Sequence, residues 1–237
     1  MTSLILQARL DSSRLPRKAL LPLGGQAVVF RVMEALSHIP CETYVLACPH
    51  DSYHDFAPLA EKAGFEICCG SKEDVLERYC EALRRFPADR LIRATADNPF
   101  VFADAAAEIN RKAINRNADY AAYDGLPYGA GVESVAAEAL FRAEKEARLP
   151  AEREHVCPFL YGNPERFSLY RSPAPLYWQG QLIRITIDTQ ADYERALSLY
   201  AALPDGDARY TGEAIIRGFN TIASNGASGN FPEQEAP

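Results

Sequence analysis

The alternation of short apolar runs with longer helical segments constrains the fold of this chain more than any other feature. The apolar runs are SLILQA (3–8), TYVLAC (43–48), FEICC (65–69) and RLIRAT (90–95), and each is followed by a longer segment with apolar residues at helical spacing, at 26–39, 51–64, 71–86 and 103–117. This rhythm predicts an α/β fold built from right-handed βαβ units, with a mostly parallel sheet flanked by helices. Ligands of such sheets bind beyond the carboxyl ends of the strands, so the residues there are the first candidates for a site.

Helix boundaries are visible in the same segments. Gly64 suits the end of the second helix, because glycine adopts the left-handed conformation that terminates helices. Ser71 and Asp74 suit the first turn of the third helix, where side-chain oxygens and negative charge are favourable.

The second half of the chain is less regular. Residues 119–136 mix short strands with Gly and Pro, 152–162 predict a short helix, 166–173 and 182–187 predict strands, and 190–203 predict a helix. We interpret residues 1–218 as a single domain in which about 124–180 form an insertion or cap that faces an acceptor or a second subunit. The polar, Gly/Ser-rich segment 219–237 is expected to be a disordered tail.

Bulk composition narrows the classes of function. The formal net charge of the 237 residues is −7, which argues against general binding of nucleic acid or anionic membranes. No apolar run approaches the roughly 18 residues of a spanning helix, and the start MTSLILQAR does not resemble a signal peptide, so a cytoplasmic protein is expected. The six cysteines form no CxxC pair; reduced thiols in the core are expected, with a zinc site or a disulfide as the alternative.

Against this acidic background, the loop QARLDSSRLPRKAL (7–20) concentrates positive charge directly after the first predicted strand. It contains Arg9, Arg14, Arg17 and Lys18. Guanidinium groups bind phosphate oxygens in pairs, and a lysine adds a mobile point charge. The loop is neither a Walker A motif nor a GxGxxG motif. Two interpretations remain: a basic loop in solvent, whose lysine would add little to stability, or a binding site for a polyphosphate.

Two aspartates stand at the ends of predicted strands. Asp97 lies in RATADNPF and Asp188 in RITIDTQADY. Each could bind a Mg²⁺ ion carried by phosphates, since Mg²⁺ typically takes one or two carboxylates besides phosphate and water. Each could equally be a helix cap or turn residue. A shared metal site requires that the ends of 90–95 and 182–187 lie side by side.

Five motifs in order give the chain a resemblance to the cytidylyltransferases that make CMP-activated acidic sugars, such as CMP-KDO and CMP-sialic acid synthetases. The spore-coat-polysaccharide F-type branch is most similar. The matching segments are QARLDSSRLPRKAL for QARxxSxRLPxKxL, CGSKEDVLERY for GSxxDVLxRY, IRATADNPF for RxTADCPL, EREHVCPFLYGNPERF for REHVTxYxxxNPxxF and RITIDTQADY for RLTVDTxxDY. The chain departs from the pattern at Asp11, where the family often has Gly, and at Asn98, where Cys is frequent.

The resemblance implies a Rossmann-like (GT-A-like) nucleotidyltransferase fold, CTP as substrate and Mg²⁺ as cofactor. It implies that Arg9, Arg14 and Lys18 grip the triphosphate and act in catalysis with Asp97, and that Asp97 and Asp188 hold the metal. Arg78 would support the loop near the base or reach the nucleotide. The acceptor or a subunit boundary would be faced by Arg153, Glu154, His155 and Glu133, with a structural role as the alternative for His155. The full implied nucleotide-binding set is Gln7, Ala8, Arg9, Ser13, Arg14, Lys18, Gly70, Ser71, Arg78, Thr95 and Ala96.

The implied reaction is transfer of CMP from CTP to a hydroxyl of a sugar or sugar acid, or to a phosphate, with release of pyrophosphate. Such a reaction belongs to surface polysaccharide or glycoconjugate biosynthesis, and a homodimer is compatible with it. The alternatives are a nucleotidyltransferase of other base specificity, a nucleotide-sugar-dependent glycosyltransferase, and a nucleotide-binding protein without catalysis. A glycosyltransferase commonly has a mid-chain DxD at a strand end, and the literal DxD here, Asp205-Gly206-Asp207, lies after the last long helix.

Overall fold

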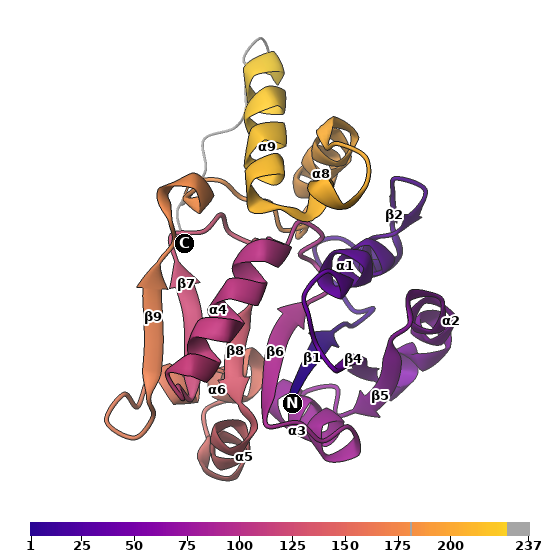
Figure 1. The fold of residues 1–237 in the computed structure, drawn as a ribbon. Coiled ribbons are helices and arrows are strands. Elements are labelled where there is room, and N and C mark those ends of the chain that lie inside the picture. Colours follow the sequence, from indigo (N-terminus) through magenta and orange to yellow (C-terminus); the bar gives the residue numbers. More distant parts are fainter. Residues whose placement is uncertain (181, 227–237) are drawn as a thin grey trace.

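A seven-stranded sheet forms the centre of the molecule in the computed structural model, which describes residues 1–180 and 182–226 (Figure 1). The strand order is β5-β4-β1-β6-β8-β7-β9. β8 runs antiparallel to both β6 and β7, and the other neighbours pair in parallel. The predicted mostly parallel mixed sheet is therefore confirmed. The strands are β1 (Thr2–Gln7), β4 (Thr43–Pro49), β5 (Glu66–Gly70), β6 (Arg90–Thr95), β7 (Tyr120–Asp124), β8 (Glu133–Ala136) and β9 (Leu169–Pro173), and β2 (Pro22–Leu23) pairs with β3 (Gln26–Ala27) in a separate ribbon.

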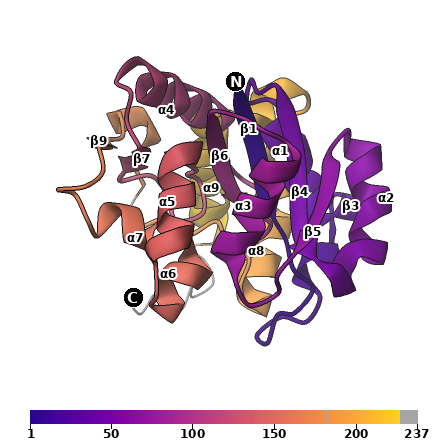
Figure 2. The same cartoon turned by 90° about the horizontal axis from the view of Figure 1, so that it is seen from below.

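Helices cover both faces of the sheet, which explains why its strands are apolar on both sides. In β1, Leu4 and Leu6 point into one core cluster and Ile5 points into the other. Figure 2 shows α4 on one side of the strands and α5 and α6 on the other. The helices are α1 (Val28–Ser37), α2 (Tyr53–Ala63), α3 (Val75–Arg85), α4 (Ala103–Asn115), α5 (Ala137–Glu146), α6 (Pro150–His155), α7 (Pro158–Tyr161), α8 (Gln190–Ala202) and α9 (Gly212–Gly226). No helix within the described ranges is long and apolar enough to cross a membrane.

The helix-boundary predictions for Gly64 and Asp74 are confirmed, whereas Ser71 lies before the N-cap of α3 and not in its first turn. Gly64 ends α2 with φ 73°, in the left-handed conformation. Asp74 is the N-cap of α3, and its carboxylate accepts a hydrogen bond from the backbone N–H of Glu77 at 2.9 Å.

The prediction of a strand at 182–187 is wrong. This segment forms one isolated bridge, between Arg184 and Tyr128. The backbone N–H of Ile185 donates to the carbonyl of Tyr128 (2.9 Å), and that of Ile187 donates to the carbonyl of Asp97 (2.8 Å). The segment thus bonds to the loops that follow β6 and β7 and not to a strand, so no ladder forms.

Residues 124–180, for which the sequence predicts an insertion or cap on the same domain, contribute two strands to the main sheet. β8 lies between β6 and β7, and β9 completes the far edge. The segment 152–162 contains two short helices, α6 and α7, because the backbone at Val156 takes φ 74° between them.

The expected start of a disordered tail at residue 219 is also wrong. Helix α9 continues to Gly226, and Phe219 and Ile222 pack against the hydrophobic core. These apolar side chains lie on one face of a helix, so they stabilise it despite the polar residues between them. The remainder of the predicted tail, 227–237, lies outside the described residues.

Candidate active site

The carboxyl ends of the two central strands bring many of the predicted site residues together. Gln7 of β1 pairs in register with Thr95 of β6, and the backbone N–H of Ala96 donates to the carbonyl of Gln7 at 2.9 Å. A cavity of about 710 Å³ opens at this edge. It is lined by the loop residues Gln7, Ala8, Arg9, Ser12, Ser13, Arg14 and Lys18, by Thr95, Ala96, Asp97 and Asn98, by Tyr128 and Asp188, and by Arg93, Glu154 and His155.

Lys18 joins the two aspartates. It begins the short 3₁₀ helix Lys18–Leu20, and its Nζ donates to Asp97 Oδ2 (3.1 Å), Asp188 Oδ1 (2.8 Å) and the carbonyl of Ile187 (2.8 Å). Because both carboxylates touch one nitrogen atom, they are far closer than the roughly 10 Å beyond which one Mg²⁺ could not bind both. Only 17% of the Lys18 side chain is exposed, so the expectation of a loop lysine in solvent is wrong.

Asp188 lies among three cations. Besides Lys18, the guanidinium groups of Arg14 (3.2 Å) and Arg184 contact its carboxylate. Burial raises the pKa of Asp188, but the hydrogen bond and charge of Lys18 and the charges of Arg14 and Arg184 outweigh burial and lower that pKa below its ordinary value. Asp188 is therefore a carboxylate at neutral pH.

Neither aspartate is a helix cap. The N-cap of α8 is Thr189, whose side chain accepts from the backbone N–H of Asp192 (3.2 Å), and the N-cap of α4 is Phe102. Asn98 holds the turn after β6, because its side-chain amide donates to Thr95 Oγ1 at 2.8 Å. The cap alternative is thus excluded for both predicted metal ligands.

The other cations of the loop have separate environments. Arg9 is exposed and has no ion-pair partner among the described residues. Arg17 adopts φ 53° and pairs with Asp55 of α2, so it does not line the cavity. Of the four cations of the loop, Arg9, Arg14 and Lys18 therefore line the cavity.

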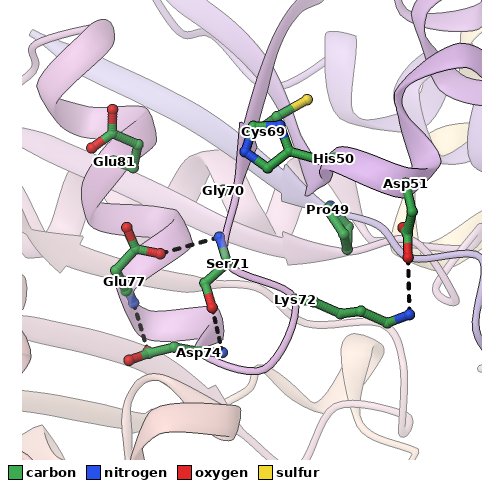
Figure 3. Close-up of a pocket in the computed structure, with 10 residues that line it drawn as sticks. All are labelled: Pro49, His50, Asp51, Cys69, Gly70, Ser71, Lys72, Asp74, Glu77 and Glu81. Atoms are coloured by element: carbon green, nitrogen blue, oxygen red, sulfur yellow. Dashed lines mark hydrogen bonds and ion pairs between the residues drawn. The ribbon is translucent and has the colours of Figure 1, made fainter.

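Gly70 and Ser71 line a second cavity of about 810 Å³ at the ends of β4 and β5 (Figure 3). A Cβ atom on Gly70 would stand 3.0 Å from Cγ of Arg78, a contact tight enough that the Arg78 side chain would have to shift slightly. Arg78 is fully buried and its Nη1 donates to the carbonyl of Ser71 at 2.6 Å. Two roles were considered for Arg78, support of the loop near the base or contact with the nucleotide. The hydrogen bond to Ser71 fits support of the loop.

Lys72 links the loops that border the two cavities. Its ammonium pairs with Asp11 of the basic loop and with Asp51 (2.9 Å) after β4, and Figure 3 shows Lys72 extending toward Asp51. Asp11 is the position at which the chain departs from the family pattern. No sequence pattern marks Lys72 as a site residue, because it is exposed and stands among polar residues.

Only some of the residues predicted to face the acceptor line the first cavity. Glu154 and His155 are exposed and line this cavity. Arg153 does not line it; its guanidinium binds Asp74 Oδ2 (2.8 Å from Nε) and the carbonyl of Glu144 (2.6 Å). Glu133 pairs with Arg93, which faces the cavity and which sequence reasoning did not select.

The profile of the cytidylyltransferase family matches residues 3–215. The chain belongs to the cytidylyltransferase family. It is 30% identical over 203 residues to the spore coat polysaccharide biosynthesis protein SpsF of Bacillus subtilis, a match that covers 83% of this chain and 85% of that protein.

Two solved structures have the same fold. One is a cytidylyltransferase from Leptospira borgpetersenii, with a TM-score of 0.86 and 23% identity, covering 98% of this chain and 99% of that one. The other is a CMP:2-keto-3-deoxy-manno-octonic acid synthetase complexed with CTP, with a TM-score of 0.66 and 15% identity, covering 84% and 98%. The predicted family, its spore-coat branch and the nucleotidyltransferase class of the enzyme are confirmed.

Proposed function

We propose that this cytidylyltransferase-family enzyme transfers CMP from CTP to a hydroxyl of a sugar or sugar acid. The hydroxyl oxygen attacks the α-phosphorus, the bond from that phosphorus to the bridging oxygen breaks, pyrophosphate leaves and the hydroxyl proton passes to water. The observation that carries the proposal is the cluster in which Lys18 touches both Asp97 and Asp188 beside a loop that offers Arg9 and Arg14. A polyanion with a divalent cation matches this arrangement of charges.

The strand order supports one direction for the nucleotide. Gly70 and Ser71 stand at the end of β5, the basic loop follows β1, and Asp97 follows β6; the order β5-β4-β1-β6 places these in sequence along one edge. The base would lie near Gly70 and Ser71, which line the second cavity. The triphosphate would then lie over Arg9, Arg14 and Lys18.

Asp97 and Asp188 would hold Mg²⁺, since two carboxylates are what this ion takes from a protein when phosphates and water fill its other positions. When bound, the metal supplies neutralisation of phosphate charge. Lys18 carries its charge on a flexible stem within reach of both aspartates, so it can serve the departing pyrophosphate. Arg9 and Arg14 hold the phosphates in position, and positioning is most of what such a reaction asks of the protein.

The similarity to SpsF supports a role in the biosynthesis of a surface polysaccharide or another glycoconjugate. The acceptor would enter the first cavity beside Arg93, Glu154 and His155, which line it.

The test is pyrophosphate release from CTP, UTP, ATP and GTP with Mg²⁺ and a panel of acceptors, combined with calorimetry of nucleotide binding. CTP should bind most tightly and react fastest. Asp97→Asn should lose the metal-dependent activity, because asparagine keeps the shape but removes the charge. Asp205→Asn is the matched control, since this exposed residue of the literal DxD lies far along the chain after α8. Tighter binding of ATP or GTP would remove the cytidylyl assignment, and inactivation by Asp205→Asn would favour the glycosyltransferase alternative.

A further inference from the structure

The acceptor end of the cavity can be located if the proposed function holds, and the inference below rests on it. The nucleotide would lie across the carboxyl ends of the strands from β5 to β6. What remains of the cavity lies toward β8 and α6, where Arg93 is the one guanidinium among the described lining residues. Glu154 and His155 of α6 complete this end.

The guanidinium of Arg93 is already paired with the carboxylate of Glu133. Arg93 and Glu133 are cross-strand partners on β6 and β8, and Nη1 of Arg93 binds Oε2 of Glu133. The other carboxylate oxygen of Glu133 accepts from the hydroxyl of Tyr120 at 2.8 Å. Both side chains are largely buried, with 18% and 20% exposed, so water screens the pair little.

Arg93 is held in its charged form. Burial lowers the pKa of Arg93, but the carboxylate of Glu133 outweighs burial, and the net pKa is raised. Because Glu133 contacts the guanidinium directly, it offsets the charge that Arg93 presents to a third group.

Neighbouring arginines offer no replacement cation. Arg153 is bound to Asp74 and Arg184 to Asp188 and Asp192. The loop cations Arg9 and Arg14 would be taken up by the triphosphate. Glu154 has no ion-pair partner among the described residues and adds a negative charge to this end.

We propose that the acceptor is an uncharged sugar or polyol, and that the Arg93–Glu133 pair selects it against sugar acids. A carboxylate entering here would exchange its hydration for a guanidinium that is already neutralised and would face Glu154, which is unfavourable for a charge leaving water. A hydroxyl group both donates and accepts hydrogen bonds, so it can use a remaining N–H of Arg93 and an oxygen of Glu154 together. The acidic acceptor of the octonic acid synthetase named above is thus not the expected class for this chain.

The first experiment compares matched acceptors. Pyrophosphate release from CTP and Mg²⁺ is measured with uncharged sugars and polyols and with the sugar acids of the same carbon skeleton, including a 2-keto-3-deoxy sugar acid. The uncharged member of each reactive pair should react at least about tenfold faster, the effect of one charge-assisted hydrogen bond. Equal or faster reaction of the acids would overturn the inference and leave the proposed function intact. Failure to bind CTP would instead remove the proposed function, and the inference with it.

The second experiment makes the pair itself the variable. Glu133→Gln keeps the size and the hydrogen bond from Tyr120 but leaves Arg93 with a free charge. It should improve the KM of a sugar acid relative to its uncharged partner by roughly tenfold or more, without changing the KM of CTP. Asp124→Asn is the matched control, because it breaks the exposed Arg171–Asp124 pair outside the cavity and should shift neither ratio.

Binding decides the matter if no compound of the panel reacts. Titration followed by ligand-observed NMR, with CMP present, should show that Glu133→Gln binds the sugar acid at least about tenfold more tightly than the unchanged protein does. The same affinity in both proteins would overturn the role of the pair. Should Glu133→Gln not fold, the comparison of acceptors in the unchanged protein still tests the class of acceptor.

Discussion

Replacing Lys18 with Met should destabilise the protein and make its stability depend on Mg²⁺. Methionine keeps the length of the side chain but removes the ammonium, which contacts two carboxylates and one carbonyl. Asp188 keeps Arg14 and Arg184, whereas Asp97 loses its one cationic partner among the described residues. The unpaired charge is therefore mainly that of Asp97.

The size of the effect follows from burial. A lost hydrogen bond to a charged group costs about 1.5–3 kcal/mol when buried and less than 1 kcal/mol when exposed. The Asp97 side chain is 30% exposed and that of Lys18 is 17% exposed, so we expect a loss of about 2 kcal/mol. For a chain of 237 residues this corresponds to a fall in Tm of roughly 4–8 °C.

Mg²⁺ provides the decisive comparison. In the variant, millimolar Mg²⁺ can take the place of the ammonium between the carboxylates and should restore much of the lost Tm. In the unchanged protein, the ion must first displace Lys18, so Mg²⁺ without nucleotide should change Tm little. Thermal unfolding with and without Mg²⁺ measures both effects, and kcat/KM with CTP should fall about 10²-fold, as for loss of other preorganised charges.

Lys62→Met is the control, because Lys62 is exposed and contacts the neutral groups of Gln26 (2.8 Å) and Phe30. Its Tm should change little and should not respond differently to Mg²⁺. If Lys18→Met were as stable as the unchanged protein, or if Mg²⁺ stabilised both equally, the reasoning about the shared cation would be refuted.

Three further results are expected. Asp97→Asn and Asp188→Asn should each reduce kcat by about 10²-fold or more, and the double variant should lose little beyond the single ones, since the first change already empties a shared metal site; additive losses would mean two independent sites. Because the folded pKa of Asp188 is lowered, its contribution to stability is complete above the unfolded pKa of about 3.9 and is lost as pH falls through the lower folded value; the stability difference between the unchanged protein and Asp188→Asn in urea unfolding should therefore shrink below about pH 4, and growth on acidification would contradict the ion pairs. Gly129→Ala should cost about 1–3 kcal/mol and reduce kcat, because Gly129 has φ 98° and a Cβ atom would stand 2.8 Å from the backbone nitrogen of Thr186; normal stability and activity would show that this loop shifts freely.

Local patterns in the sequence account for the first half of the fold. Each apolar run with its following helix is a self-contained signal, and caps such as Asp74 depend on residues a few positions away. Asp97 was also accessible to sequence reasoning, because a residue at the carboxyl end of a parallel strand faces the ligand crevice whatever the rest of the sheet does. Asp188 was selected on the expectation of a strand that does not form.

Features that depend on sheet order were not accessible. Lys72 meets Asp11, and Arg93 meets Glu133, only because the order of the strands brings their loops and edges together. The segment 182–187 alternates like a strand, but its backbone bonds to Tyr128 and Asp97, which lie in loops. These hydrogen bonds place Asp188 beside Lys18.

The C-terminal helix was missed for a different reason. Its Asn, Ser and Gly residues dominate the composition, yet Ile215, Phe219 and Ile222 recur at helical spacing and pack on the core. Periodicity was the better guide than composition here.

Because of the ion pairs of Lys72 with Asp11 and Asp51, ionic strength should act on nucleotide binding in two opposing ways. Lys72 is exposed, and its pairs with Asp11 and Asp51 hold together loops that border both cavities. Surface pairs of this kind weaken as salt shortens the Debye length to about 8 Å near physiological conditions. If the nucleotide binds as proposed, salt should slow its arrival by screening the basic loop, and it should also loosen the contacts that Lys72 makes between the two loops.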